Sequence, residues 1–362
     1  MTVVDHLRHL VAFNTTNPPR EIFADQGIFA YARSILEEAG FAIELTDLGE
    51  GCLYLYAHRG DPAVLFNVHL DTVPADENYT ADPWTLRVDQ DRAIGLGACD
   101  IKGAAAGLLA AAEATSGPAA ILFSSDEEAG SSVCIKHFCA HLPRNFDAVI
   151  VAEPTNARAV TGHRGIKTFT GRFQGTSGHS SGPRALEESA LHRASSWVHA
   201  AVTQAALDRE EMTFENLAGS CFNVGVIEGG KKPNIVASQA TIRWGVRPLP
   251  GQDADTLADH YFALSDPDHV EWLPGFSGPS LPAHTGTEGL KMVEKARAVA
   301  ECLQLPPGES VNFWTEAALF SHAGLPAIVF GPGSIAQAHT ADEWVSLGDL
   351  DAVTAVYTRI FS

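Results

Sequence analysis

The sequence predicts an α/β protein in which a small βαββαβ domain is inserted into a larger three-layer domain. Before residue 162, apolar strand-like runs alternate with helical patterns, which is typical of helices packed on a largely parallel sheet. After that point the order of patterns becomes strand, helix, strand, strand, helix, strand, the ferredoxin-like unit. The length of 362 residues also exceeds the size at which one core stops growing.

The first domain is expected to begin with helical patterns over residues 2–40, interrupted by the loop FNTTNPPR. A helix is expected over IKGAAAGLLAAAEA, residues 101–114, whose small side chains let it lie close against a sheet. The mixed, largely parallel sheet should contain four apolar runs, at residues 54–58, 63–70, 119–125 and 147–153.

The inserted domain should have an alternating strand at 167–175, a helix at 185–208, strands at 222–227 and 240–249, a helix at 253–265 and a strand at 269–273. After Pro274 the chain returns to helical and strand patterns that complete the first sheet. We therefore expect residues 1–162 and 274–362 to form the larger domain and residues 163–273 to form the inserted one.

Composition excludes several classes of protein. With 24 basic and 44 acidic residues, the net charge of −20 argues against nucleic-acid and anionic-membrane partners. The six cysteines are scattered without a CxxC pair, so neither a zinc ribbon nor a disulfide framework is predicted, and reduced thiols fit a cytoplasmic location. The N-terminus lacks an uninterrupted signal-peptide core, and no apolar run nears a membrane-spanning length.

Polar residues follow several of the apolar strands. His69 and Asp71 end the run VLFNVHLDTVP, a spacing typical of a metal-bound imidazole and the carboxylate that orients it, although an isolated HxD triplet is often accidental. Asp100 precedes the small-residue helix, where it could simply cap that helix. The remaining candidates are Glu127 and Glu128, which could form a solvated acidic turn, Glu153 at the end of another strand, and His339, which could be a surface histidine.

Open α/β sheets bind ligands at the carboxyl ends of their strands, so these side chains are expected to converge. Two histidines and several carboxylates without a thiolate suit zinc, cobalt or manganese, and the carboxylate excess allows a bridged pair of ions. Adjacent Glu127 and Glu128 would repel each other unless one bound a cation and the other shared a proton with water or substrate. We therefore expect one of these two glutamates to be a metal ligand and the other to be a catalytic base.

Six segments occur in order along the chain: FNVHLDTVP, GLGACDIKGAAAG, SSDEEAG, VAEPT, GTSGHSS and AHTADEW. Together they resemble the zinc-dependent aminoacylase and carboxypeptidase (M20) family, particularly its acetylornithine deacetylase branch. The resemblance implies one ion held by His69, Asp100 and Glu153, with Asp100 bridging to a second held by Glu128 and His339. It further implies that Asp71 orients His69 and that Glu127 is the general base and acid.

The resemblance implies that residues 1–162 and 274–362 form a metal-binding catalytic domain and that residues 163–273 form a lid and dimerisation domain. In this inserted domain it further implies that His179 in GTSGHSS reaches the substrate oxygen, often across a dimer, and that Asn234 and Arg247 contact substrate. Arg247 suits a bidentate grip on an α-carboxylate, but could also be a structural strand residue. His179 could instead be a turn histidine. A serine-hydrolase interpretation of Ser180 and Ser181 is disfavoured because GHSS lacks the GxSxG elbow.

The implied activity is removal of the acetyl group from an N-acetyl-L-amino acid, N-acetyl-L-citrulline or N2-acetyl-L-ornithine, in arginine biosynthesis. The implied cofactor is zinc, one or two ions per chain, with cobalt possible, and the implied partners are a small-molecule substrate and a second copy of the chain. Alternatives are a desuccinylase or dipeptidase of the same family, or a binding protein that lost its metals. Retention of all five apparent ligands and Glu127 argues against the last.

Overall fold

The computed structural model describes residues 1–19, 22–208 and 212–362, and the chain divides into two compact units. Unit 1 comprises Met1–Thr161, Leu290–Glu309 and Thr315–Ser362, and unit 2 comprises Gly162–Gly289 and Ser310–Trp314. The described helices include none long and apolar enough to cross a membrane.

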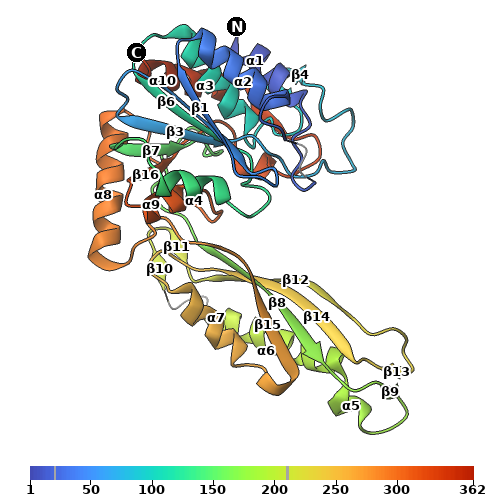
Figure 1. Ribbon diagram of the computed structural model, residues 1–362. Coiled ribbons are helices and arrows are strands. Elements are labelled where there is room, and N and C mark those ends of the chain that lie inside the picture. The colour runs from blue at the N-terminus through green and yellow to red at the C-terminus, as the bar shows by residue number, and fades with distance from the viewer. Residues whose placement is uncertain (20–21, 209–211) are drawn as a thin grey trace. The chain divides into compact units, whose positions relative to one another are not determined.

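Unit 1 is built on a six-stranded mixed sheet of order β1-β2-β6-β3-β7-β16, in which β6, β3, β7 and β16 run parallel (Figure 1). Every residue of β3, β6 and β7 is buried, as expected for strands covered on both faces. The six strands are β1 (Ala42–Asp47), β2 (Leu53–Arg59), β3 (Val64–His69), β6 (Ala119–Ser124), β7 (Ala148–Val151) and β16 (Ala327–Val329).

Helices lie on both sides of this sheet (Figure 1). One layer holds α1 (Val3–Val11), α2 (Gly27–Glu38), α3 (Lys102–Ala114) and α10 (Leu347–Ile360), and the other includes α4 (Val133–Ala140) and α9 (Ala317–His322). The small residues of α3 allow close packing, since a Cβ on Gly107 would lie 2.9 Å from the Thr354 hydroxyl of α10. The expected three-layer domain is confirmed.

The sequence patterns missed some peripheral elements of unit 1. The antiparallel edge strand β1 was not predicted, because its outward positions are polar and only partly buried. A small sheet of order β17-β5-β4 was also missed, since each of its strands has only three residues: β4 (Arg87–Asp89), β5 (Arg92–Ile94) and β17 (Trp344–Ser346). Its strand β17 follows the segment that carries His339.

Unit 2 has the βαββαβ order, with an antiparallel sheet of order β12-β14-β8-β15. Two helices pack on one face of this sheet over an aromatic core that contains Trp197, Trp244 and Tyr261. The main elements are β8 (Ile166–Gln174), α6 (Ala190–Asp208), β12 (Cys221–Gly229), β14 (Gln239–Arg247), α7 (Ala254–Phe262) and β15 (Val270–Gly278). The shorter ones are β9 (Gly178–His179), α5 (Ala185–Glu188), β10 (Thr213–Phe214), β11 (Leu217–Ala218) and β13 (Ile235–Val236).

The observed boundary at the end of unit 2 differs from the expected return after residue 273. Strand β15 continues through Pro274 to Gly278, and helix α8 (Gly286–Cys302) begins before unit 1 resumes at Leu290. Pro274 is tolerated because β15 is an edge strand and carries a bulge between Pro274 and Ser277. The strand therefore does not end at Pro274, which instead lies at the bulge within it.

Candidate metal centre

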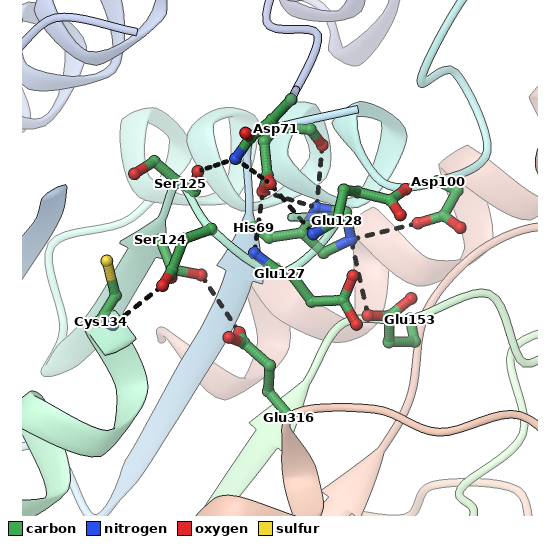
Figure 2. A network of polar contacts seen from close by, with 12 residues as sticks. His69, Asp71, Asp100, Ser124, Ser125, Glu127, Glu128, Cys134, Glu153 and Glu316 are labelled. Atoms are coloured by element: carbon green, nitrogen blue, oxygen red, sulfur yellow. Dashed lines mark hydrogen bonds and ion pairs between the residues drawn. The ribbon is translucent and has the colours of Figure 1, made fainter. Parts of the chain in front are cut away.

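The parallel strands of unit 1 deliver the predicted ligands to one edge of the sheet. His69 is the last residue of β3, Glu128 lies in the turn after β6, and Glu153 lies just beyond β7. Asp100 comes from the loop before α3, and His339 from the segment before β17. Figure 2 shows His69, Asp100, Glu128 and Glu153 converging from these separate elements.

Asp100 lies between the two histidines. Its Oδ1 is 3.2 Å from Nε2 of His69, and its Oδ2 is 3.5 Å from Nε2 of His339. The other pairs are equally close, with His69 Nε2 3.6 Å from Glu153 Oε1 and His339 Nε2 3.0 Å from Glu128 Oε1. Both histidines thus lie close to Asp100. Each also has a second carboxylate nearby, Glu153 for His69 and Glu128 for His339.

These separations fit metal coordination. Two ligand atoms that each lie about 2.0–2.1 Å from a tetrahedral zinc ion are about 3.3 Å apart. Ligand atoms of His69, Asp100 and Glu128 also all lie within 4.8 Å of one another. Imidazole and carboxylate donors without thiolate suit zinc and related divalent ions, and a carboxylate that offers one oxygen to each side suits a bridged pair. The residues present therefore fit the predicted ions.

Hydrogen bonding orients His69 for ligation. Its Nδ1 lies 2.9 Å from the backbone carbonyl of Asp71 and 3.4 Å from Oδ1 of the same residue. Because a carbonyl only accepts, Nδ1 carries a proton, and Nε2 is the ring nitrogen that faces Asp100 and Glu153 and would bind a metal ion. The sequence predicted a carboxylate as the orienting group, whereas the nearer partner is the main chain of Asp71.

The carboxylate of Asp71 instead binds the backbone of the turn that contains Glu127 and Glu128, the acidic turn. It accepts hydrogen bonds from the backbone N–H groups of Glu127 at 3.3 Å and Glu128 at 3.0 Å, and from Nδ2 of Asn17 at 3.1 Å (Figure 2). Asp71 is fully buried, so these bonds offset the cost of removing its charge from water. One residue thereby orients both a candidate ligand and the turn that carries Glu127.

The clustered carboxylates shift one another's protonation. Burial and then the charges of Glu128 and Glu153 raise the pKa of Glu127 well above its usual range, against the opposing effect of His69. Burial and the Asp100 charge raise the pKa of Glu153 to about 8, and the hydrogen bond to Glu128 raises the pKa of His339 to about 9. Such a group of buried acids favours a bound cation.

Two buried acids of this region were not singled out from the sequence. Glu316, at the start of α9, accepts a hydrogen bond from the Ser124 hydroxyl at 3.1 Å, and burial raises its pKa well above the usual range (Figure 2). Glu343 accepts three backbone hydrogen bonds from the loop that carries Asp100. Glu343 lies four residues beyond His339, within the segment AHTADEW. Its place in this segment was the only feature of the sequence that could have indicated a role at the centre.

The three remaining candidates lie in unit 2. His179 in β9 pairs with Ile235 in β13, and the backbone N–H of Ser180 donates to the carbonyl of Asn234, so His179 and Asn234 are neighbours. Arg247 is the last residue of β14 and is partly buried, lining a hollow of about 390 Å³ on the sheet with Asn223 and Thr168.

Comparison with known proteins identifies the family. The family model described as peptidase family M20/M25/M40 matches residues 65–362, most of the chain. The chain belongs to this family. It is 48% identical to the N-acetyl-L-citrulline deacetylase of Xanthomonas campestris pv. campestris, over 100% of this chain and 98% of that protein. It is 32% identical to the acetylornithine deacetylase of Aliivibrio salmonicida, over 90% of this chain and 88% of that one.

Solved structures of the family share the fold. An M20 family metallo-carboxypeptidase from Sulfolobus solfataricus matches with a TM-score of 0.75 and 17% identity, covering 99% of this chain and 98% of that one. At this identity the likeness concerns the fold alone, and it confirms the expected α/β architecture. The resemblance inferred from the six sequence segments is likewise confirmed.

Proposed function

We propose that this chain is a metal-dependent deacetylase that hydrolyses the amide bond of an N-acetyl-L-amino acid, with N-acetyl-L-citrulline preferred over N2-acetyl-L-ornithine, as a step of arginine biosynthesis. The observation that carries the proposal is a dinuclear-type ligand set around Asp100 in a chain 48% identical, end to end, to an N-acetyl-L-citrulline deacetylase. The six free cysteines are compatible with a cytoplasmic location.

The proposed ligands form two sets that share Asp100. His69, Asp100 and Glu153 would hold one ion, and Asp100, Glu128 and His339 the other, with zinc the expected metal and cobalt an alternative. When bound, such ions lower the pKa of a coordinated water toward about 7 and polarise the carbonyl that is attacked. Two such ions would also offset the negative charges of Asp100, Glu128 and Glu153.

Glu127 would act as general base and then general acid. It is adjacent to the ligand Glu128, and its turn is fixed by two backbone hydrogen bonds to Asp71. Burial raises its pKa, which favours a carboxylate able both to accept a proton and to return it. Glu127 would take a proton from the attacking water and transfer it to the leaving amine nitrogen, giving acetate and a free amino acid.

In unit 2, His179 would donate a hydrogen bond to the carbonyl oxygen of the substrate as negative charge develops there. The backbone nitrogen of Ser181 lies 3.2 Å from Nδ1 of His179, and its N–H can only donate, so Nδ1 accepts and the ring proton lies on Nε2. Nε2–H is therefore the available donor. Arg247 would bind the α-carboxylate, Asn234 would contact substrate beside His179, and the lid would form a homodimer surface.

The side chain of the substrate distinguishes the main candidates, because citrulline ends in a neutral ureido group and ornithine in a cationic amine. The test is release of free α-amine from N-acetyl-L-citrulline, N2-acetyl-L-ornithine and N-succinyl-diaminopimelate by the zinc-loaded full chain. We expect the highest kcat/KM for N-acetyl-L-citrulline. Preference for the succinylated substrate would indicate a desuccinylase, and no release from any of them would overturn the deacetylase proposal in favour of a dipeptidase or binding protein.

A further inference from the structure

Glu343 connects two parts of the candidate metal centre that are far apart in the sequence. Its Oε1 accepts hydrogen bonds from the backbone N–H groups of Cys99 and Asp100, both at 2.8 Å, and its Oε2 accepts from that of Gly97 at 2.9 Å. Its own carbonyl accepts from the N–H of Gly95 at 2.9 Å. The whole residue is only 2% exposed.

These bonds determine the path of the Asp100 loop. Residues 95–100 lie in neither a helix nor a strand, so their N–H groups have no regular ladder to join. Gly97 has a φ of +77°, a conformation that glycine adopts without strain. A buried carboxylate is costly unless hydrogen-bonded, and three N–H donors compensate it here. The loop and the carboxylate are therefore mutually dependent.

The two histidines of the centre differ in their support. His69 is 2% exposed in its side chain and is held by the Asp71 carbonyl. The side chain of His339 is 51% exposed and contacts the acids Glu128 and Asp100. The position of His339 relative to Asp100 consequently depends on how its own segment is attached to the Asp100 loop.

We propose that Glu343 is a positioning residue that fixes the His339 segment against the Asp100 loop and thereby sets the affinity of the second metal position, formed by Asp100, Glu128 and His339. The inference rests on the proposed function, because it assumes that these side chains bind metal. Outer partners of metal ligands typically contribute about 10–100-fold to affinity. The first position shares Asp100 but should depend less on Glu343, because its other ligands, His69 and Glu153, belong to neither the Asp100 loop nor the His339 segment.

The test is stepwise zinc binding by the metal-free full chain, comparing wild type with Glu343→Gln. The amide keeps the shape of the side chain but directs an NH₂ group at backbone N–H donors. We expect the second equivalent of zinc to bind about 10–100-fold more weakly and the first to change by less than about threefold. Glu113→Gln, which alters a carboxylate bonded to His6 and the N-terminal amine, is the matched control and should leave both steps unchanged.

Equal weakening of both steps, no change in either, or a wild-type chain that binds a single ion would overturn the inference. If Glu343→Gln does not fold, amide hydrogen exchange in the metal-free wild type replaces it: Gly97, Cys99 and Asp100 should be protected, and exchange at the rate of an exposed loop would refute the role of Glu343. Zinc binding requires no substrate, so failure of the deacetylase proposal would appear separately, as wild type that holds two ions without hydrolysing the acetylated substrates.

Discussion

The two units support their candidate functional residues in different ways. In unit 1, His69, Asp71 and Glu153 are buried, and buried hydrogen bonds fix His69 and Asp71 in their orientations. In unit 2, His179 and Asn234 are exposed and are placed mainly by main-chain pairing between two short strands. Buried carboxylates need hydrogen-bond donors around them to offset the cost of removing their charge from water, whereas side chains that contact a substrate must remain accessible to it.

The largest effect expected within unit 1 is that of Glu127→Gln. Loss of a general base should reduce kcat by about 10²–10⁴-fold, while the zinc content stays at the wild-type value because Glu127 is not a proposed ligand. Initial rates with N-acetyl-L-citrulline and metal analysis of the same sample test this. Glu128→Gln is the control, since it should lose zinc. A Glu127→Gln protein within tenfold of wild-type kcat would remove Glu127 from its proposed role.

Asp71→Asn tests whether the buried hydrogen bonds around Asp71 in unit 1 support metal binding. The amide can no longer accept from both the acidic turn and Asn17, so we expect zinc affinity to fall by about 10–100-fold, measured by chelator competition. Asp76→Asn, at an exposed turn, should leave affinity unchanged. Wild-type affinity in Asp71→Asn would show that the main chain alone positions His69.

Arg247→Lys tests the proposal that Arg247 in unit 2 binds the α-carboxylate of the substrate. A lysine keeps the charge but loses the bidentate geometry, so KM for the acetylated amino acid should rise about tenfold with little change in kcat or zinc content. Arg172→Lys, on the neighbouring strand β8 and exposed, is the control. If KM is unchanged, Arg247 is a structural strand residue.

The smallest effect is expected for Ser181→Ala, which removes a hydroxyl but keeps the backbone N–H that faces His179. Its kcat should remain within about twofold of wild type, because the loss of one exposed hydrogen bond costs little. Nitrogen-15 NMR of histidine-labelled protein should show the Nε2–H tautomer of His179 in both proteins. The Nδ1–H tautomer would contradict the proposed donor role.

The same contrast explains what could be predicted from the sequence. Strands β3, β6 and β7 were recognisable because they are short, largely apolar runs followed by polar residues, and their shared direction predicted that His69, Glu128 and Glu153 would converge. The order of elements in unit 2 was recognisable for similar reasons. The catalytic and substrate-contact roles of the predicted residues stay predictions until they are measured.

The supporting residues were not predictable, because their roles depend on pairings across the chain. Glu343 bonds the N–H of Asp100, 243 positions earlier, and Glu316 bonds Ser124, 192 positions earlier. An isolated glutamate in a sequence gives no sign of such a partner. The backbone carbonyl of Asp71 was missed for another reason: every residue has a carbonyl, so the pattern of side chains could not indicate which one faces His69.

The most direct test of the central claim is the rate of acetate release from N-acetyl-L-citrulline by chelator-treated protein as zinc is added in measured equivalents. The ligand geometry around Asp100 predicts no activity without metal and a rise that is complete by two equivalents per chain. Full activity in the metal-free protein, or no activity with two ions bound, would contradict the assignment of hydrolysis to this centre.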